Sequence, residues 1–152
     1  MSGEVLLYQR HDGALYACGF SRDRAGRLVV NGWYAVISSD APDDEVGAAV
    51  QEGLRLGEEP VDVAAEDSQE LLEPLLKAAG VRNFTAFTRD ARAVGAGRSD
   101  SGAYYFIPMR NPNRARENGL LDMDEELTLR SGASTGEIGR TAREGLGRSL
   151  VE

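Results

Sequence analysis

The feature that most constrains this chain is an internal repeat of ten residues. The segment EVGAAVQEGL (45–54) returns 92 residues later as EIGRTAREGL (137–146). Between 39–54 and 131–146, seven positions are identical at this spacing. The identical pairs are Ser39/Ser131, Ala41/Ala133, Glu45/Glu137, Gly47/Gly139, Glu52/Glu144, Gly53/Gly145 and Leu54/Leu146. Agreement of this extent predicts two similar elements in equivalent places of one fold.

Each copy of the repeat combines a short strand with a helix. AVISSDAPDDEVG and LTLRSGASTGEIG both have the pattern of a strand, a loop and a helix start. Apolar residues then recur at helical spacing, so helices are expected over about 43–56 and 135–149. Ser134 and Glu137 have the spacing of a capping box, which marks the start of the second helix.

The two repeat helices are unusual in their glycine content. Each carries glycine at positions 3 and 9 of the repeat, which are Gly47, Gly53, Gly139 and Gly145. A glycine inside a helix costs about 1 kcal/mol relative to alanine. Four such positions indicate that the helix backbones lie close against something flat. We expect this surface to be the sheet formed by the strands.

The remaining chain is predicted to be mostly strand. Alternating apolar segments separated by turn signals such as Asp12-Gly13 occur at 4–10, 14–20, 28–38, 84–94, 102–109 and 126–130. Residues 95–102 are expected to form a flexible hairpin loop. A further helix near 68–79 should end at Gly80, with Pro74 marking either a kink or its regular start. The predicted fold class is α+β: a single domain, 1–152, with three helices packed on a mostly antiparallel sheet.

The charge of the chain is unevenly distributed. The net charge is −8, but residues 40–73 contain twelve acidic residues and one arginine, so the rest of the chain carries +3. A strongly acidic segment repels nucleic acid and attracts basic proteins, although an ordinary solvated surface explains it equally well. Seven arginines lie between Arg82 and Arg116. They lack the interleaved aromatic residues typical of nucleic-acid modules, and an RNA-binding module remains only an alternative.

Composition favours a cytoplasmic location without membrane contact. No apolar run approaches the ~18 residues that a membrane span needs, and the start MSGEVLLYQR does not resemble a signal peptide. Cys18 is the sole cysteine, so no internal disulfide can form.

Residues that could carry chemistry are few. His11 and Cys18 flank one predicted hairpin, and carboxylates cluster at 122–126 without the spacing of a calcium loop. The glycine-rich stretch at 95–102 lacks the ending of a phosphate loop. We interpret the protein as a non-enzyme without metal or cofactor. An enzyme using Cys18 with His11, or the carboxylates at 122–126, stays as an alternative.

Several strings point to a family. They are the Y-x-R motif at Tyr8–Arg10, GWYAVISSDAPDDEVGAAVQEGL, YYFIPMRNP and the closing STGEIGRTAREGLGRS. Together they resemble the CdiI-type immunity proteins of bacterial contact-dependent growth inhibition systems, in particular a sub-family whose last helix has the pattern E-[IVL]-G-x-x-x-x-E-x-L-x-R-S. The matching positions are Glu137, Ile138, Gly139, Glu144, Leu146, Arg148 and Ser149.

The resemblance implies a cytoplasmic protein that binds the C-terminal toxin domain of its cognate CdiA effector and blocks the active site or substrate face. It implies no catalysis and no cofactor. Many such toxins are nucleases with basic faces, so the acidic segment is expected to act there as a nucleic-acid surrogate. The alternative is an acidic, non-enzymatic adaptor or regulator without a toxin partner.

Candidate contact residues follow from charge and expected exposure, because interface residues do not transfer between immunity proteins. The glycine-rich hairpin contributes a charged pair, and two adjacent tyrosines on a strand must point to opposite faces, so that one is exposed. The candidates are Asp43, Asp44, Glu58, Glu59, Asp62, Glu66, Asp67, Arg98, Asp100, Tyr104 and Tyr105.

Overall fold

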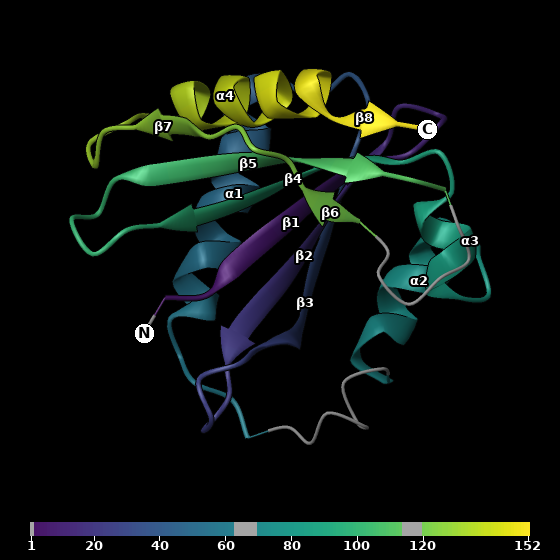
Figure 1. The fold of residues 1–152 in the computed structure, drawn as a ribbon, viewed down its shortest axis with the longest axis horizontal. Helices are drawn as coiled ribbons and strands as arrows, with labels where there is room; N and C mark the ends of the chain where they lie inside the picture. The colour runs from purple at the N-terminus through teal and green to yellow at the C-terminus, as the bar shows by residue number, and fades with distance from the viewer. Residues whose placement is uncertain (1, 63–69, 114–119) are drawn as a thin grey trace.

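The computed structural model describes residues 2–62, 70–113 and 120–152 (Figure 1). The strands are β1 (Glu4–Gln9), β2 (Leu15–Arg22), β3 (Leu28–Ile37), β4 (Arg92–Arg98), β5 (Tyr104–Asn111), β6 (Leu121–Asp122), β7 (Leu127–Leu129) and β8 (Leu150–Val151). The helices are α1 (Asp43–Gly57), the 3₁₀-helix η1 (Glu70–Leu72), α2 (Glu73–Ala79), α3 (Phe84–Thr88) and α4 (Thr135–Arg148). The predicted α+β class with a mostly antiparallel sheet is confirmed.

The sheet is built from two similar halves. Its order is β3-β2-β1-β4-β5, and β7 pairs with β5 at the far edge. The units β1-β2-β3-α1 and β4-β5-β7-α4 therefore follow the same path outward from the antiparallel β1–β4 pair. An approximate two-fold axis through that pair exchanges the halves, and the sequence repeat is the trace of this symmetry at the strand–helix end of each unit.

Two glycines set how closely the repeat helices approach each other. A Cβ atom on Gly47 would lie 1.8 Å from the carbonyl oxygen of Thr135, and one on Gly139 would lie 1.9 Å from that of Asp43. These contacts are equivalent, because both members of the second pair lie 92 residues from their counterparts in the first. Gly47 and Gly139 thus face the other helix, which corrects the expectation that they face the sheet.

The other two helix glycines do face the sheet, as expected. A Cβ on Gly53 would lie 2.5 Å from side-chain atoms of Val5 and Trp33, and one on Gly145 would lie 2.6 Å from Val94. Each helix therefore has one glycine for its partner helix and one for the strands below. The repeat glycines have a structural role in both places.

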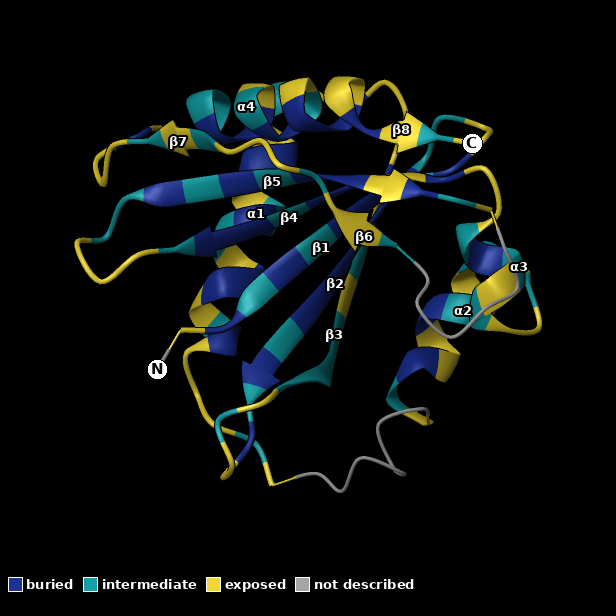
Figure 2. Ribbon diagram, viewed as in Figure 1, coloured by how far each residue is buried: buried dark blue, intermediate teal, exposed yellow. Residues whose placement is uncertain are grey.

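Each face of the sheet carries a separate core (Figure 2). One core fills the space between the sheet and the helices α1 and α4, and we call it the helix-side core. On the opposite face, α2 and α3 cover one end of the sheet. There Phe87 stacks edge-on against Tyr8 and Tyr16 at 5.1 and 5.4 Å, and the Arg10 guanidinium lies 5.6 Å from the same ring. Tyr8 and Arg10 of the Y-x-R motif are therefore core residues.

The predicted strand at 84–94 is wrong. Residues 84–88 form α3, and β4 begins only at Arg92. The Asn83 side chain accepts a hydrogen bond from the Ala86 N–H and caps the helix, which places the buried Phe87 ring in the aromatic cluster. Strand β4 then continues to Arg98, into the stretch predicted to be a loop.

The predicted helix near 68–79 is confirmed in its regular part. Residues 63–69 lie outside the described ranges, η1 begins at Glu70 and α2 runs over 73–79. Pro74 stands in the first turn of α2, so it marks the start of the regular helix. Gly80 ends the helix with a φ of 72°, a left-handed conformation that glycine adopts without strain.

We expect Gly47→Ala to destabilise the protein by about 2 kcal/mol or more, because the new methyl group meets a backbone oxygen that cannot move alone. Gly147→Ala is the matched control. A Cβ at this position of α4 meets no atom within 4 Å, so the substitution should stabilise by about 0.5 kcal/mol. Urea unfolding measures both changes, and equal effects would contradict the close helix crossing.

Candidate protein-binding surface

The candidate contact residues come from three separate segments of the chain. Asp43 and Asp44 begin α1, Glu58 and Glu59 follow its end, and Arg98 starts the turn between β4 and β5. Helix α1 has 15 residues, so its ends are about 22 Å apart at 1.5 Å per residue. The acidic segment is therefore not one compact patch. Glu66 and Asp67 lie outside the described residues.

The carboxylates at the start of α1 have partners within the chain. Asp43 forms an ion pair with Arg143 of α4 at 2.9 Å, and the same arginine donates a hydrogen bond to the Ala41 carbonyl. Asp44 accepts a hydrogen bond from the Thr135 hydroxyl at 3.4 Å. Both side chains connect the two repeat helices, which limits what they can offer to another molecule.

The carboxylates that follow α1 are more exposed and more weakly held by partners within the chain. Glu58 and Glu59 are exposed. Asp62 pairs with Arg24 at 2.8 Å, but both side chains are at least three-quarters exposed. An ion pair this exposed contributes little stability. Asp62 can therefore leave Arg24 and pair with a cation of another molecule at a small cost in free energy.

A shallow hollow at one end of the molecule brings three candidates together. Its lining consists of Ser2, Glu58, Arg98, Ser99, Asp100 and Gly102, and its volume is about 550 Å³. We call it the hairpin hollow, since most of these residues belong to the β4–β5 hairpin. Glu58 and Gly102, which are 44 positions apart, thus lie on one surface. This surface carries both signs of charge, which suits recognition of a charged protein partner.

Arg98 is held in place within the hairpin hollow. Its guanidinium donates two hydrogen bonds to the Gly102 carbonyl, at 3.1 and 3.0 Å, and lies 4.7 Å from the centre of the Tyr104 ring. The tyrosine is itself buried, with 4% of its surface exposed. A fixed arginine loses little side-chain entropy when a partner binds.

Tyr104 and Tyr105 point to opposite faces of the sheet, as predicted. Tyr104 belongs to the helix-side core, whereas Tyr105 is partly exposed on the other face. The Tyr105 ring covers Gly97, and its hydroxyl donates a hydrogen bond to Glu4 at 3.1 Å. Partial burial, and then the neighbouring Glu4 carboxylate, raise the pKa of Tyr105 to about 12. Of the two, Tyr105 alone can contact another molecule.

Sequence reasoning missed a second exposed surface, on the sheet face opposite α1 and α4. We call it the open face and define it by Leu6, Tyr34, Gly95, Tyr105 and Ile107, all of which are intermediate or exposed. The alternation of GAYYFIPM already places Tyr105 and Ile107 on one face. What the sequence does not reveal is that α2 and α3 stop short of them.

The alternative of a cysteine enzyme has no support in the geometry. Cys18 is 2% exposed, and burial raises the pKa of its thiol to about 12, so the reactive thiolate is absent at neutral pH. His11 is exposed in the β1–β2 turn. Within the described ranges, no three potential metal ligands lie close enough to share an ion.

Three of the five described arginines in 82–113 make contacts within the chain. Arg92 donates a hydrogen bond to the Ser149 carbonyl at 2.6 Å. Arg98 donates to the Gly102 carbonyl within the β4–β5 hairpin, and Arg110 pairs with Glu152 at 3.4 Å. Residues 114–119 lie outside the described ranges. The described arginines therefore form no continuous track of the kind that follows a nucleic-acid backbone.

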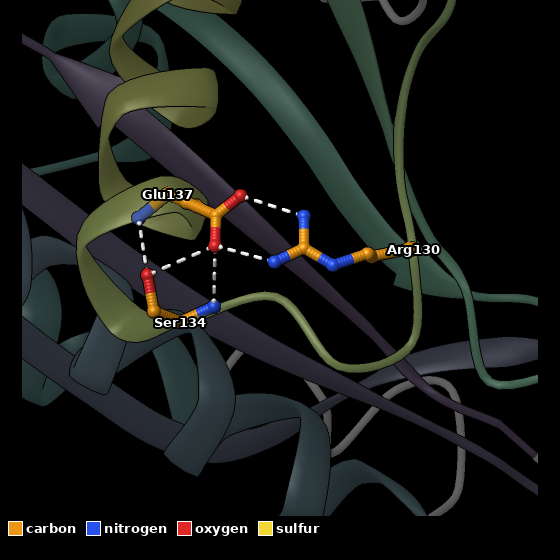
Figure 3. Close-up of polar contacts among 3 residues, drawn as sticks. All are labelled: Arg130, Ser134 and Glu137. Carbon is orange, nitrogen blue, oxygen red and sulfur yellow. Dashed lines mark hydrogen bonds and ion pairs between the residues drawn. The ribbon is translucent and has the colours of Figure 1, made fainter.

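The closing motif of the chain is structural. Ser134 and Glu137 form the predicted capping box. The Arg130 guanidinium donates two hydrogen bonds to the Glu137 carboxylate, at 2.8 and 3.0 Å (Figure 3). Arg130 and then the Ser134 N–H lower the pKa of Glu137 to about 2. At the other end of the motif, the Ser149 hydroxyl joins β4 to β5, because it accepts from the Ala93 N–H and donates to the Met109 carbonyl.

Solved structures share this fold. A chain of a CdiA-CT/CdiI toxin and immunity complex from Yersinia pseudotuberculosis matches with a TM-score of 0.74 and 15% identity, over 98% of either chain. A protein of unknown function from Neisseria meningitidis matches with a TM-score of 0.75 and 15% identity, over 98% of this chain and 96% of that one. The resemblance to CdiI-type proteins is thus confirmed at the level of the fold.

Comparisons of the sequence alone give no match. The sequence matches no protein-family model and no curated protein. In the described part of the chain, no helix has the length and apolar character needed to cross a membrane.

We expect Glu137→Gln to lower the free energy of unfolding at pH 7 and to flatten its acid dependence. The folded-state pKa lies below the usual 4.5, so the carboxylate stabilises the fold above pH 4.5, and this stability is lost as the pH falls towards 2. Urea unfolding at pH 7, 4 and 3 should show the gap between variant and wild type closing. Glu144→Gln is the control, because it removes the same charge near the other end of α4 together with a surface ion pair to Arg148. It should cost less stability at pH 7 than Glu137→Gln.

We expect Cys18 to react with a chromogenic thiol reagent only after the protein unfolds, because the thiol is buried and protonated. The test compares the rate of labelling in native buffer with the rate in a concentration of urea that unfolds the protein, at the same pH. Rapid native labelling would contradict the buried position of β2.

Proposed function

We propose that this protein is an immunity protein that binds and neutralises the C-terminal toxin domain of a CdiA effector in the cytoplasm of the producing cell. The observation that carries the proposal is the full-length fold similarity to a chain of a toxin and immunity complex. The sequence motifs agree with it, and the buried thiol and separated histidine favour a role without catalysis. Binding rather than reaction is then the task of the surface.

The hairpin hollow is the proposed contact surface for a basic toxin. Glu58 and Asp100 present exposed carboxylates in the hairpin hollow, and Glu59 is exposed next to Glu58 in the chain. Arg98 is held within the hollow by Gly102 and Tyr104. A nuclease has a basic face for its substrate, and these carboxylates would occupy it in place of phosphates. Long-range attraction speeds such an encounter, and paired charges determine specificity.

Calorimetry with the toxin domain encoded directly upstream of this gene tests the proposal. We expect nanomolar affinity that weakens as salt rises, together with loss of toxin activity in the mixture. Absence of binding, or of a toxin gene upstream, would overturn the immunity role and favour the alternative of an acidic adaptor without a toxin partner.

The contact surface has its own test. The double variant Glu58→Gln/Asp100→Asn should weaken toxin binding at least about tenfold and reduce its salt dependence. Glu70→Gln/Glu73→Gln removes the same charge from η1 and α2, where both side chains are exposed, and is the matched control. Equal losses in the two double variants would mean that net charge alone matters and that the hairpin hollow is not the contact.

A further inference from the structure

The residues in 2–62, 70–113 and 120–152 cover only part of the sheet face opposite α1 and α4. Residues of η1, α2 and α3 form a core there with Tyr8, Tyr16, Cys18 and Ala93. Tyr34, Tyr105 and Ile107 lie on the same face, yet they belong to neither core of the protein. Three large side chains without a place in a core mark a surface available to another molecule.

The residues of the open face belong to one row across the sheet. Strand pairing aligns Tyr34 with Cys18, Cys18 with Leu6, Leu6 with Gly95, and Gly95 with Ile107. Residues paired across neighbouring strands point to the same face. One position from each of five adjacent strands therefore lies side by side. Cys18 is buried in the core beneath η1 and α2, so the accessible part of the row is Leu6, Gly95 and Ile107, and Tyr34 stands apart at the edge with 37% of its surface exposed.

The middle of this row is a depression. The two glycines of β4 on this face differ, because the Tyr105 ring fills the space over Gly97, whereas a Cβ on Gly95 would approach no atom closer than Leu6 at 3.5 Å. Gly95 has no side chain and thus leaves space between its row neighbours Leu6 and Ile107, and we call this space the recess. An apolar side chain of a partner fits such a recess.

The rim of the open face is acidic. Glu4 accepts the Tyr105 hydrogen bond, Glu126 lies near enough to raise the pKa of Tyr105, and Asp122 pairs across from Met109 on the same face. None of these three carboxylates forms an ion pair with a residue in 2–62, 70–113 or 120–152. Arg22 is a basic neighbour of Tyr105 and acts in the opposite direction, lowering its pKa.

From this combination we infer that the open face binds a basic segment of the toxin that carries an apolar side chain at its tip. The tip fills the recess over Gly95 between Leu6 and Ile107, and the basic flanks meet Glu4, Asp122 and Glu126. The inference rests on the proposed function. It adds a second surface, which meets the hairpin hollow at the β4–β5 hairpin, so the toxin contacts that hairpin on both faces.

The test compares toxin binding by Ile107→Lys and Leu150→Lys. Both substitutions place a lysine on an exposed or partly exposed strand position, but Leu150 lies in β8, away from the open face. Ile107→Lys should weaken binding at least about tenfold, since it inserts a positive charge opposite a basic segment. Leu150→Lys should remain within about twofold of wild type. Circular dichroism and urea unfolding verify that both variants fold.

A second variant decides the question if Ile107→Lys does not fold. Gly95→Ala adds a methyl group in ordinary contact distance of Leu6, so the fold tolerates it while the recess becomes shallower. It should weaken toxin binding several-fold without loss of stability. Unchanged binding by Gly95→Ala, or equal losses for the two lysine variants, would overturn the inference.

Two further outcomes separate this inference from the proposed function. Wild-type protein that does not bind the toxin overturns the immunity role, whereas wild-type binding with unaffected open-face variants overturns the open face alone. Sedimentation of the free protein gives the third measurement. A wild-type dimer that Ile107→Lys dissociates would show that a second copy of this chain occupies the face, which also overturns the inference.

Discussion

The contact between two helix backbones determines the layout of this protein. Gly47 and Gly139 let α1 and α4 approach until the backbone oxygens of Thr135 and Asp43 touch the opposite helix. Because the helices are that close, together they cover the centre of one sheet face and enclose the helix-side core. The inserted segment with α2 and α3 is then the part of the described chain that serves the other face, and it covers one end of it.

The repeat could be predicted from the sequence because its information is local. Apolar spacing, capping residues and glycine positions all lie within a few residues of one another, and they identified both helices. The error at 84–94 arose where local preference and tertiary packing disagree. Phe84 and Thr85 favour a strand, yet three-residue spacing brings Phe84 and Phe87 to one side of a short helix, against Tyr8.

The candidate site depends on contacts between residues far apart in the chain, which local patterns do not encode. Charge and expected exposure nominated Asp43, but its pairing with Arg143 crosses 100 positions. The hairpin hollow joins the end of α1 to a hairpin 40 residues later. The open face depends on where covering helices stop. Such features can be seen only once the sheet is assembled. The identity of a binding partner depends on the surface of a second molecule, which this sequence does not contain.

The capping box, the crossing glycines and the Ser149 bridge place the motifs of the two repeat helices inside the structure or at a helix end. The hairpin hollow is built from side chains outside all the motifs, whereas Tyr34, Tyr105 and Ile107 of the open face belong to two of the strand motifs. Substitutions on the exposed positions of these surfaces leave the scaffold intact, so the binding properties of the protein can change by small steps while the architecture persists. Divergence of sequence under a constant fold, as in chains with 15% identity and nearly complete overlap, is the expected result when the residues that maintain the fold are separate from those that meet a partner.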